Sequence, residues 1–275
     1  MHIELAENYG FCFGVKRAIK IAEENSNSVT YGPLIHNSKE IARLDADFKV
    51  GLVEDFKTFK SGEKVIVRTH GIVKDELEAL NKSGVDVVDA TCPFVTKPQE
   101  IAQEMSEAGY DVLIFGDQKH PEIKGVQSYA THGAIVVTDV EELKKIKFHE
   151  KIALIAQTTR KVEDYMDIAN YLIPRYKEVR VFNTICNATF ENQVAVRDIS
   201  ELADVMIIIG GKNSSNTKQL FNIANEKCQD SYHIEDENEL EDSWFKDKEF
   251  CGVSAGASTP DWIIQNVLNS IKKKC

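Results

Sequence analysis

The chain has 275 residues, of which 43% are apolar, with only 15 glycines and 6 prolines, so it can bury an ordinary core and is neither disordered nor fibrous. Its formal net charge of −11 opposes the attraction on which binders of nucleic acid and anionic lipid depend, so we expect neither nucleic acid nor membrane as a partner. The polar, acidic opening residues lack a secretory signal, and apolar runs such as 205–209 are too short to span a bilayer. We therefore expect a cytoplasmic protein.

Helix-like and strand-like segments alternate along the chain. From Cys12 we expect a helix over 15–24, a short strand near 29–31, and then Gly32 with the polar loop PLIHNSKE. A strand over 64–67 ends in RTHG, and a helix to residue 80 and a strand over 85–88 lead to Cys92. Such alternation favours parallel sheets, in which the loops at the carboxyl ends of the strands bind ligands.

The same order of elements returns after Cys92. Here we expect a helix over 101–108, a strand over 112–115, and then Gly116 with the polar loop DQKHPE. A strand over 152–156 ends in QTT, and a helix to about residue 171 and a strand over 179–182 lead to Cys186. The segment between two cysteines is therefore an internal repeat.

A third copy follows Cys186 and continues into the two chain ends. It comprises a helix including 194–202, a strand over 205–209, Gly210 with the loop GKNSSN, a strand over 251–253 ending in AGAST, and a helix over 260–271. Cysteine and glycine are 24 residues apart in the last two copies, at 92 and 116 and at 186 and 210. This spacing aligns His120 with Ser214 and Glu122 with Asn216.

The repeat predicts an α/β fold of three pseudo-equivalent units. We place the units at 14–95, 96–183 and 184–275, with the N-terminal segment 1–13 completing the third. A trefoil-like arrangement about one axis would bring three cysteines and six polar loops to one central place. The alternative is one doubly wound domain with an appendage.

The six cysteines divide into two groups by their place in the repeat. Cys12, Cys92 and Cys186 lie at equivalent strand-to-helix turns, where backbone N–H groups and the helix dipole favour a thiolate. Three convergent thiolates could hold zinc with a fourth ligand, or a 4Fe-4S cluster with one iron open to substrate, and composition does not choose between these. Cys228, Cys251 and Cys275 have no equivalent positions, and we expect small buried side chains there.

Mostly neutral hydrogen-bonding side chains follow the strand ends. They are His36, Asn37, Thr69, His70, His120, Glu122, Thr158, Thr159, Ser214, Ser215, Asn216 and Ser258. With strand-end N–H groups they suit a small phosphorylated ligand, although each serine or threonine alone is equally typical of a helix cap. Glu122 is the only carboxylate of the set. We expect enclosure to raise its pKa so that it donates a proton near neutral pH, the alternative being a solvated loop glutamate.

Nine ordered motifs carry a resemblance to a known family. They are GFCFGVKRAI at 10–19, LIHN at 34–37, RTHG at 68–71, DATCPFVTK at 89–97, HPEIKG at 120–125, QTT at 157–159, NTICNAT at 183–189, KNSSNT at 212–217 and SAGASTPD at 254–261. Together they resemble the IspH/LytB family, the 4-hydroxy-3-methylbut-2-enyl diphosphate reductases. The match runs from residue 10 to residue 261 and includes every segment singled out above.

The resemblance implies a cytoplasmic iron-sulfur oxidoreductase of the methylerythritol phosphate route to isoprenoids. Such an enzyme reductively removes the allylic hydroxyl of (E)-4-hydroxy-3-methylbut-2-enyl diphosphate and forms isopentenyl and dimethylallyl diphosphates. A 4Fe-4S cluster with one open iron would lie beside the substrate pocket at the centre of the trefoil, held by Cys12, Cys92 and Cys186. An external electron donor such as ferredoxin or flavodoxin is implied as a partner.

The resemblance also assigns roles to the loop residues. Substrate binding is implied for His36, His70, His120, Thr158, Ser214, Ser215, Asn216 and Ser258. Proton delivery is implied for Glu122 with Thr158, while the open iron acts as a Lewis acid toward the hydroxyl and two electrons pass in single steps.

Two other functions fit the same residues. A non-redox hydro-lyase could use a three-cysteine cluster with an open iron to activate a hydroxyl without transferring electrons. An iron or redox sensor that binds a phosphorylated effector would need a tail or basic segment for a partner. The candidate segment for that role is KKK at 272–274, which we interpret as a solvated helix end.

Overall fold

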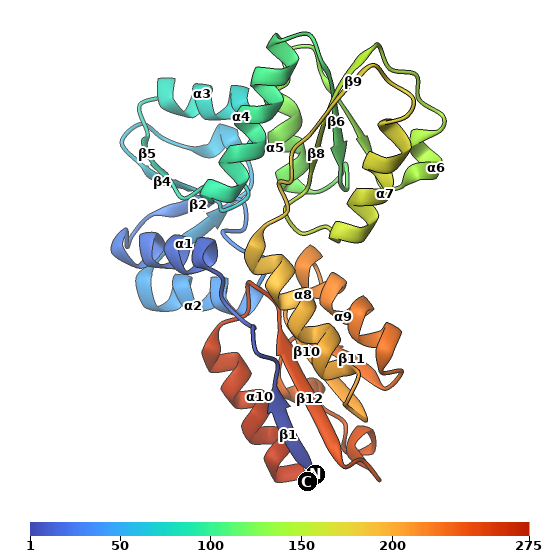
Figure 1. Ribbon diagram of the computed structural model, residues 1–275. Coiled ribbons are helices and arrows are strands. Elements are labelled where there is room, and N and C mark those ends of the chain that lie inside the picture. The colour runs from blue at the N-terminus through green and yellow to red at the C-terminus, as the bar shows by residue number, and fades with distance from the viewer. Residues whose placement is uncertain (275) are drawn as a thin grey trace. The chain divides into compact units, whose positions relative to one another are not determined.

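The strands of the protein form three separate four-stranded sheets, each entirely parallel (Figure 1). The computed structural model describes residues 1–274, so the expectation for Cys275 lies outside the described residues. The α/β class and the three sheets confirm the repeat and contradict a single doubly wound domain. By their contacts the residues divide into two compact units, which are described separately; the ranges 14–95, 96–183 and 184–275 stay a prediction.

The first unit comprises Met1–Lys16, Ile35–Arg43 and the chain from Asn187 onward. Its sheet has the order β1 (His2–Leu5), β12 (Phe250–Ala255), β10 (Val205–Ile209), β11 (Ser231–Ile234). Alternate residues of β10 face opposite sides, as in any strand. Val205, Ile207 and Ile209 pack with α10 (Asp261–Lys274), whereas Met206 and Ile208 pack with α8 (Asn187–Ser200) and α9 (Ser215–Lys227). Two 3-10 turns, Glu237–Glu239 and Asp242–Phe245, follow β11.

The second unit comprises Arg17–Leu34 and Leu44–Cys186, and it contains two sheets. One has the order β3 (Gly51–Val53), β2 (Val29–Tyr31), β4 (Lys64–Val67), β5 (Asp86–Asp89), with α3 (Lys74–Lys82) and a 3-10 turn, Phe56–Thr58, beside it. The other has the order β7 (Ala134–Val137), β6 (Asp111–Phe115), β8 (Lys151–Ala156), β9 (Glu178–Val181). One face of this sheet packs with α6 (Val140–Leu143) and α7 (Val162–Leu172), the other with α4 (Pro93–Glu107) and α5 (Pro121–Tyr129).

All three sheets have the same internal order. The strand that ends in RTHG, QTT or AGAST (β4, β8 or β12) lies beside the strand that leads to a cysteine (β5, β9 or β1). Its other neighbour is the strand that follows the preceding cysteine and its helix (β2 after Cys12, β6 after Cys92 or β10 after Cys186), and a short edge strand completes each sheet (β3, β7 or β11). Because β1 comes from the start of the chain and β12 from near its end, the circular order predicted for the third copy is confirmed.

The structure also corrects several expectations. The edge strands and β1 were not predicted, because they are short and only partly buried. The loops after Gly32, Gly116 and Gly210 turn quickly into helices, namely α2 (Ser38–Phe48), α5 and α9. The predicted helix over 194–202 ends at Ser200, and Leu202 beyond it is 72% exposed. Across residues 1–274, no helix combines the length and the apolar character needed to cross a membrane.

Candidate functional site

Cys12, Cys92 and Cys186 share one backbone arrangement. The N–H of each donates a hydrogen bond to the carbonyl two residues beyond the end of the motif-bearing strand. The acceptors are Ala257 at 3.2 Å, Thr69 at 3.0 Å and Thr158 at 2.9 Å, respectively. Each cysteine lies just before a helix (α1, Phe13–Glu24, then α4 and α8). All three are partly exposed, whereas Cys228 and Cys251 are buried as expected.

In the second unit, Glu122 and Thr158 form a buried pair. Both carboxylate oxygens of Glu122 accept hydrogen bonds from Thr158, one from its N–H and one from its hydroxyl, each at 2.7 Å. Glu122 lies in the first turn of α5 and is 1% exposed, which excludes a solvated loop glutamate. Burial raises the pKa of the Glu122 carboxyl above its ordinary value, although the two hydrogen bonds act to lower it.

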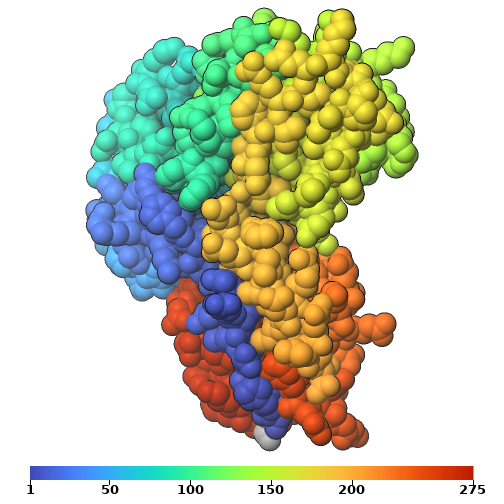
Figure 2. Space-filling view, in the orientation of Figure 1, coloured from blue at the N-terminus to red at the C-terminus, as the bar shows by residue number. Residues whose placement is uncertain are grey.

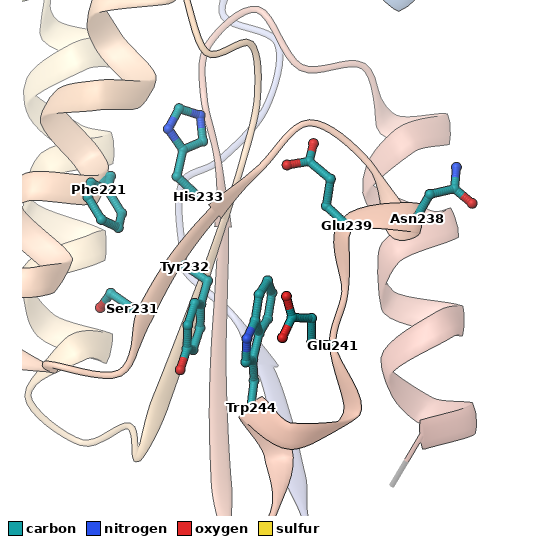
Figure 3. A pocket seen from close by; sticks show the side chains of 8 residues that line it. All are labelled: Phe221, Ser231, Tyr232, His233, Asn238, Glu239, Glu241 and Trp244. Atoms are coloured by element: carbon teal, nitrogen blue, oxygen red, sulfur yellow. The ribbon is translucent and has the colours of Figure 1, made fainter.

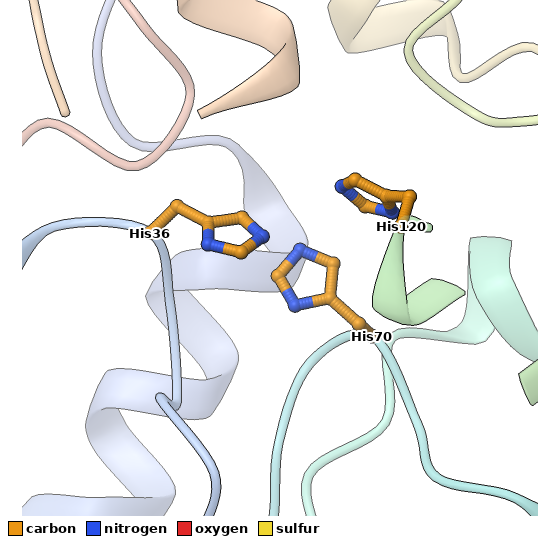
Figure 4. A group of neighbouring side chains, drawn as sticks. All are labelled: His36, His70 and His120. Carbon is orange, nitrogen blue, oxygen red and sulfur yellow. The ribbon is translucent and has the colours of Figure 1, made fainter. Parts of the chain in front are cut away.

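His120 caps the helix that carries Glu122. Its Nδ1 accepts a hydrogen bond from the N–H of Glu122 at 3.2 Å, so a neutral His120 carries its proton on Nε2. The rings of His70 and His120 meet edge to face with centroids 5.4 Å apart (Figure 4). Because Nδ1 accepts the capping hydrogen bond, the neutral His120 ring presents a donor, Nε2–H, on the side away from the helix terminus.

These contacts make one continuous series between two of the cysteines. The N–H of Cys92 donates a hydrogen bond to the carbonyl of Thr69. The hydroxyl of Thr69 in turn lies 3.4 Å from Nδ1 of His70. From His70 the series passes through His120, Glu122 and Thr158 to Cys186. The second unit thus brings together all of the predicted site residues that it contains, with Thr159 beside them, its hydroxyl accepting from Gln157 at 3.1 Å.

In the first unit, the segment 35–43 brings His36 to the loop after β12. The hydroxyl of Ser258 donates to the carbonyl of His36 at 3.3 Å, and Ser258 follows Ala257, the partner of Cys12. Gly211 approaches the same carbonyl so closely that an added Cβ would lie 2.3 Å from the oxygen. The Asn37 side chain accepts from the N–H of Glu40 at 3.1 Å, so Asn37 caps α2.

The N-terminus of α9 carries the remaining predicted residues. Ser214 caps the helix by accepting from the N–H of Thr217 at 3.2 Å, and Ser215 and Asn216 are its first two residues. Asn216 is 5% exposed, and neither its amide nitrogen nor its amide oxygen has a hydrogen-bond partner among the described residues. Because a buried amide without partners is costly, this side chain is suited to a ligand at the helix terminus.

The structure adds two residues that sequence reasoning did not single out, Glu40 and Thr217. Glu40 is buried and accepts hydrogen bonds from Arg43 at 2.7 Å and from the indole of Trp262 at 2.9 Å, which ties the His36 segment to α10. The sequence Asn37-Ser-Lys-Glu40 has a cap residue followed three positions later by glutamate, a signal that could have identified Glu40. Thr217 is fully buried in the first turn of α9, and its place at the end of the motif KNSSNT is the signal that could have identified it.

A pocket of about 560 Å³ also lies in the first unit (Figure 3). Its lining includes Tyr232 and Trp244, whose rings stack 3.9 Å apart, and the carboxylates of Glu239 and Glu241. None of the predicted site residues lines this pocket. The two carboxylates in the lining disfavour an anionic ligand there.

Comparisons with known proteins agree on one family. A family model described as "LytB protein" matches residues 3–272. The chain is 74% identical over 272 residues to the 4-hydroxy-3-methylbut-2-enyl diphosphate reductase of Sulfurimonas denitrificans, covering 99% of both chains.

Two solved structures are similar throughout. One is a structure of (E)-4-hydroxy-3-methyl-but-2-enyl diphosphate reductase, the terminal enzyme of the non-mevalonate pathway, with 43% identity, a TM-score of 0.72, and coverage of 98% of this chain and 99% of that one. The other is the E-1-hydroxy-2-methyl-but-2-enyl-4-diphosphate reductase of Plasmodium falciparum, with 26% identity, a TM-score of 0.92, and coverage of 97% and 86%.

Proposed function

The chain belongs to the LytB family, and from this membership we infer that it is a 4-hydroxy-3-methylbut-2-enyl diphosphate reductase, the terminal enzyme of the non-mevalonate pathway. It is an iron-sulfur oxidoreductase that acts on a small-molecule diphosphate. The products are isopentenyl and dimethylallyl diphosphates. The reaction takes up two electrons and two protons, breaks the allylic C–O bond, and releases the hydroxyl oxygen as water.

The cofactor of this proposal is a 4Fe-4S cluster held by Cys12, Cys92 and Cys186. The donor set fits such a group, because three partly exposed thiols have the same backbone placement at the start of a helix. When bound, a cluster with three thiolate ligands supplies single electrons and one open iron that binds the substrate hydroxyl. Thiolates of this kind need a reducing compartment, which supports a cytoplasmic location.

The buried pair of Glu122 and Thr158 carries the proposal. The Thr158 carbonyl accepts a hydrogen bond from the N–H of Cys186, and the Thr158 hydroxyl is hydrogen-bonded to Glu122. Thr158 therefore connects the acid Glu122 to a proposed cluster ligand. Its raised pKa keeps the Glu122 carboxyl protonated to a higher pH than an exposed glutamate. A protonated Glu122 gives its proton to the Thr158 hydroxyl, which passes its own proton to the departing hydroxyl of the substrate.

The proposed diphosphate ligands are side-chain and helix N–H donors. In the second unit these are His70 and the Nε2–H of His120, and in the first they are His36, Ser258 and the helix terminus at Ser214, Ser215 and Asn216. Neutral donors and helix N–H groups bind an anion without requiring a basic surface. This reconciles a diphosphate substrate with the net charge of −11.

Reductant dependence tests the reductase against the hydro-lyase. The anaerobic holoenzyme is given the diphosphate substrate with and without reduced methyl viologen, and the diphosphate products are quantified. We expect turnover only with the reductant and two viologen radicals consumed per product. Product formation without reductant would overturn the reductase and favour the hydro-lyase, while binding without turnover in either arm would favour a sensor.

A further inference from the structure

One face of α1 combines an aromatic ring with three positive charges. Phe13, Lys16, Arg17 and Lys20 follow each other at the spacing of one helix face, while Val15, Ala18, Ile19 and Ala22 on the opposite face are buried. We call these four exposed or partly exposed residues the α1 stripe. The first carboxylates of the helix come only in its last turn, where Glu24 lies 3.7 Å from Lys20.

Phe13 is 63% exposed, which is unusual for phenylalanine in a folded chain. Two other phenylalanines are exposed among the described residues, Phe94 at 46% and Phe190 at 44%. They lie on the first turns of α4 and α8, within four residues of Cys92 and Cys186. Exposed aromatic side chains therefore accompany each of the proposed cluster ligands, and such side chains are enriched in protein interfaces.

The stripe is connected to the backbone near two of these ligands. The helix begins directly after Cys12. The guanidinium of Arg17 donates to the carbonyls of Thr91 at 3.2 Å and Asp89 at 3.4 Å, in the segment that leads to Cys92. Figure 2 shows α1, in blue, at the molecular surface.

We propose that the α1 stripe is the docking surface for a small acidic protein that carries single electrons on an iron-sulfur or flavin group. This rests on the proposed function, which needs two electrons per substrate. Each docked carrier is oxidised by one electron, and two successive carriers with two protons convert the allylic alcohol to the deoxygenated product and water. A cationic stripe on a chain of net charge −11 attracts an acidic partner, and the helix that carries it begins directly after Cys12, one of the proposed cluster ligands.

Charge reversal on the stripe provides the kinetic test. The variant is Lys16→Glu with Lys20→Glu, and the control is Lys272→Glu with Lys273→Glu in the exposed last turn of α10, which changes net charge equally. The holoenzyme is assayed with a reduced acidic 2Fe-2S ferredoxin and, separately, with reduced methyl viologen. We expect the KM for ferredoxin to rise about tenfold or more in the stripe variant only, with viologen-driven turnover unchanged.

Calorimetry of oxidised ferredoxin with the holoenzyme gives a readout independent of turnover. We expect binding that weakens with salt, is lost in the stripe variant, weakens on Phe13→Ser and survives in the control. The docking surface would be overturned if the stripe variant and the control variant had equal effects. It would also be overturned if neither the stripe variant nor Phe13→Ser changed the binding of ferredoxin. If the wild type turns over with neither donor, the proposed function fails, and the calorimetry still decides the docking surface.

Discussion

At the scale of single residues, Glu122 is subject to opposing influences. Two hydrogen bonds from Thr158 favour its charged form, whereas complete burial favours its neutral form, and burial prevails because the pKa is raised. The same group therefore keeps its proton to a higher pH than an exposed glutamate and has a hydrogen-bonded neighbour that can accept it. That combination is what a general acid requires.

Replacing Glu122 by glutamine separates proton delivery from folding. We expect Glu122→Gln to lower turnover by about 10²-fold or more, because the amide keeps the shape but supplies no proton. Bound iron and affinity for the diphosphate should stay near those of the wild type. Exposed Glu78→Gln on α3 is the matched control. Turnover of Glu122→Gln near that of the control would remove Glu122 from the proton path.

The raised pKa also gives the pH dependence a definite sign. Protonated Glu122 stabilises the folded state fully below about pH 4.5, its ordinary value, and this contribution is lost as the pH rises through the raised pKa. Turnover should fall over the same range as the acid form disappears. Urea unfolding should show the stability of Glu122→Gln rising relative to that of the wild type as the pH increases above about 4.5, because glutamine stays neutral. A difference that is constant with pH would contradict the assignment.

At the scale of elements, the first turn of α9 is held in place because Thr217 packs closely against the ends of two strands, β10 and β12. Thr217 packs against Gly256 so closely that an added Cβ would lie 2.1 Å from its Oγ1, and Gly210 at the end of β10 is nearly as close, at 2.6 Å. Thr217 lies one residue beyond Asn216. The position of the proposed anion site therefore depends on two residues without side chains.

Gly256→Ala tests this dependence. We expect the new methyl group to displace the first turn of α9, raising the KM for the diphosphate substrate and lowering the free energy of unfolding by about 1–3 kcal/mol. Adding Thr217→Ala should restore part of the lost affinity by making room. Gly51→Ala is the control, since its Cβ would meet ordinary contact at 3.6 Å. An unchanged KM in Gly256→Ala would show that the glycine does not position α9.

A strand can be predicted from sequence when its own residues, rather than its pairing with distant strands, determine its structure. The run 205–209 was predicted to the residue, because β-branched and apolar side chains fill both faces of a buried strand. β1 and β11 carry polar residues at half of their positions, so their strand state depends on pairing with distant neighbours. In the site, the alignment predicted that Glu122 and Asn216 are equivalent, but it placed both in loops, whereas each is the buried second residue of a helix. The hydrogen bonds from cysteine N–H groups to Thr69, Thr158 and Ala257 join distant segments, and no sequence pattern specifies them.

At the scale of the whole molecule, the cysteines proposed as ligands contribute nothing to the hydrophobic cores. Each sheet has apolar clusters of its own, and Cys12, Cys92 and Cys186 belong to none of those described, whereas Cys251 is fully buried in the core beneath α10. Folding of the sheets and retention of iron should therefore be separable.

Two serine substitutions should have opposite effects. We expect Cys92→Ser to lose iron and turnover while the far-ultraviolet circular dichroism and the cooperativity of unfolding of the iron-free protein stay unchanged. Cys251→Ser should retain iron but lower the free energy of unfolding by about 1–3 kcal/mol, because it buries a hydroxyl in an apolar core. Iron content and urea unfolding measure both. The reverse pattern would refute the ligand set.

The pairing of β1 with β12 sets an order of events during synthesis. The strands of the other two sheets lie within residues 29–89 and 111–181, so each can close as soon as its own stretch has left the ribosome. β1 emerges first but must wait for β12, roughly ten to fifty seconds at ordinary rates of translation. Cys12 waits with it, because the carbonyl of Ala257 arrives later still. The three thiols share one backbone arrangement only after residue 257 has been synthesised, so metal loading follows the synthesis of all three sheets.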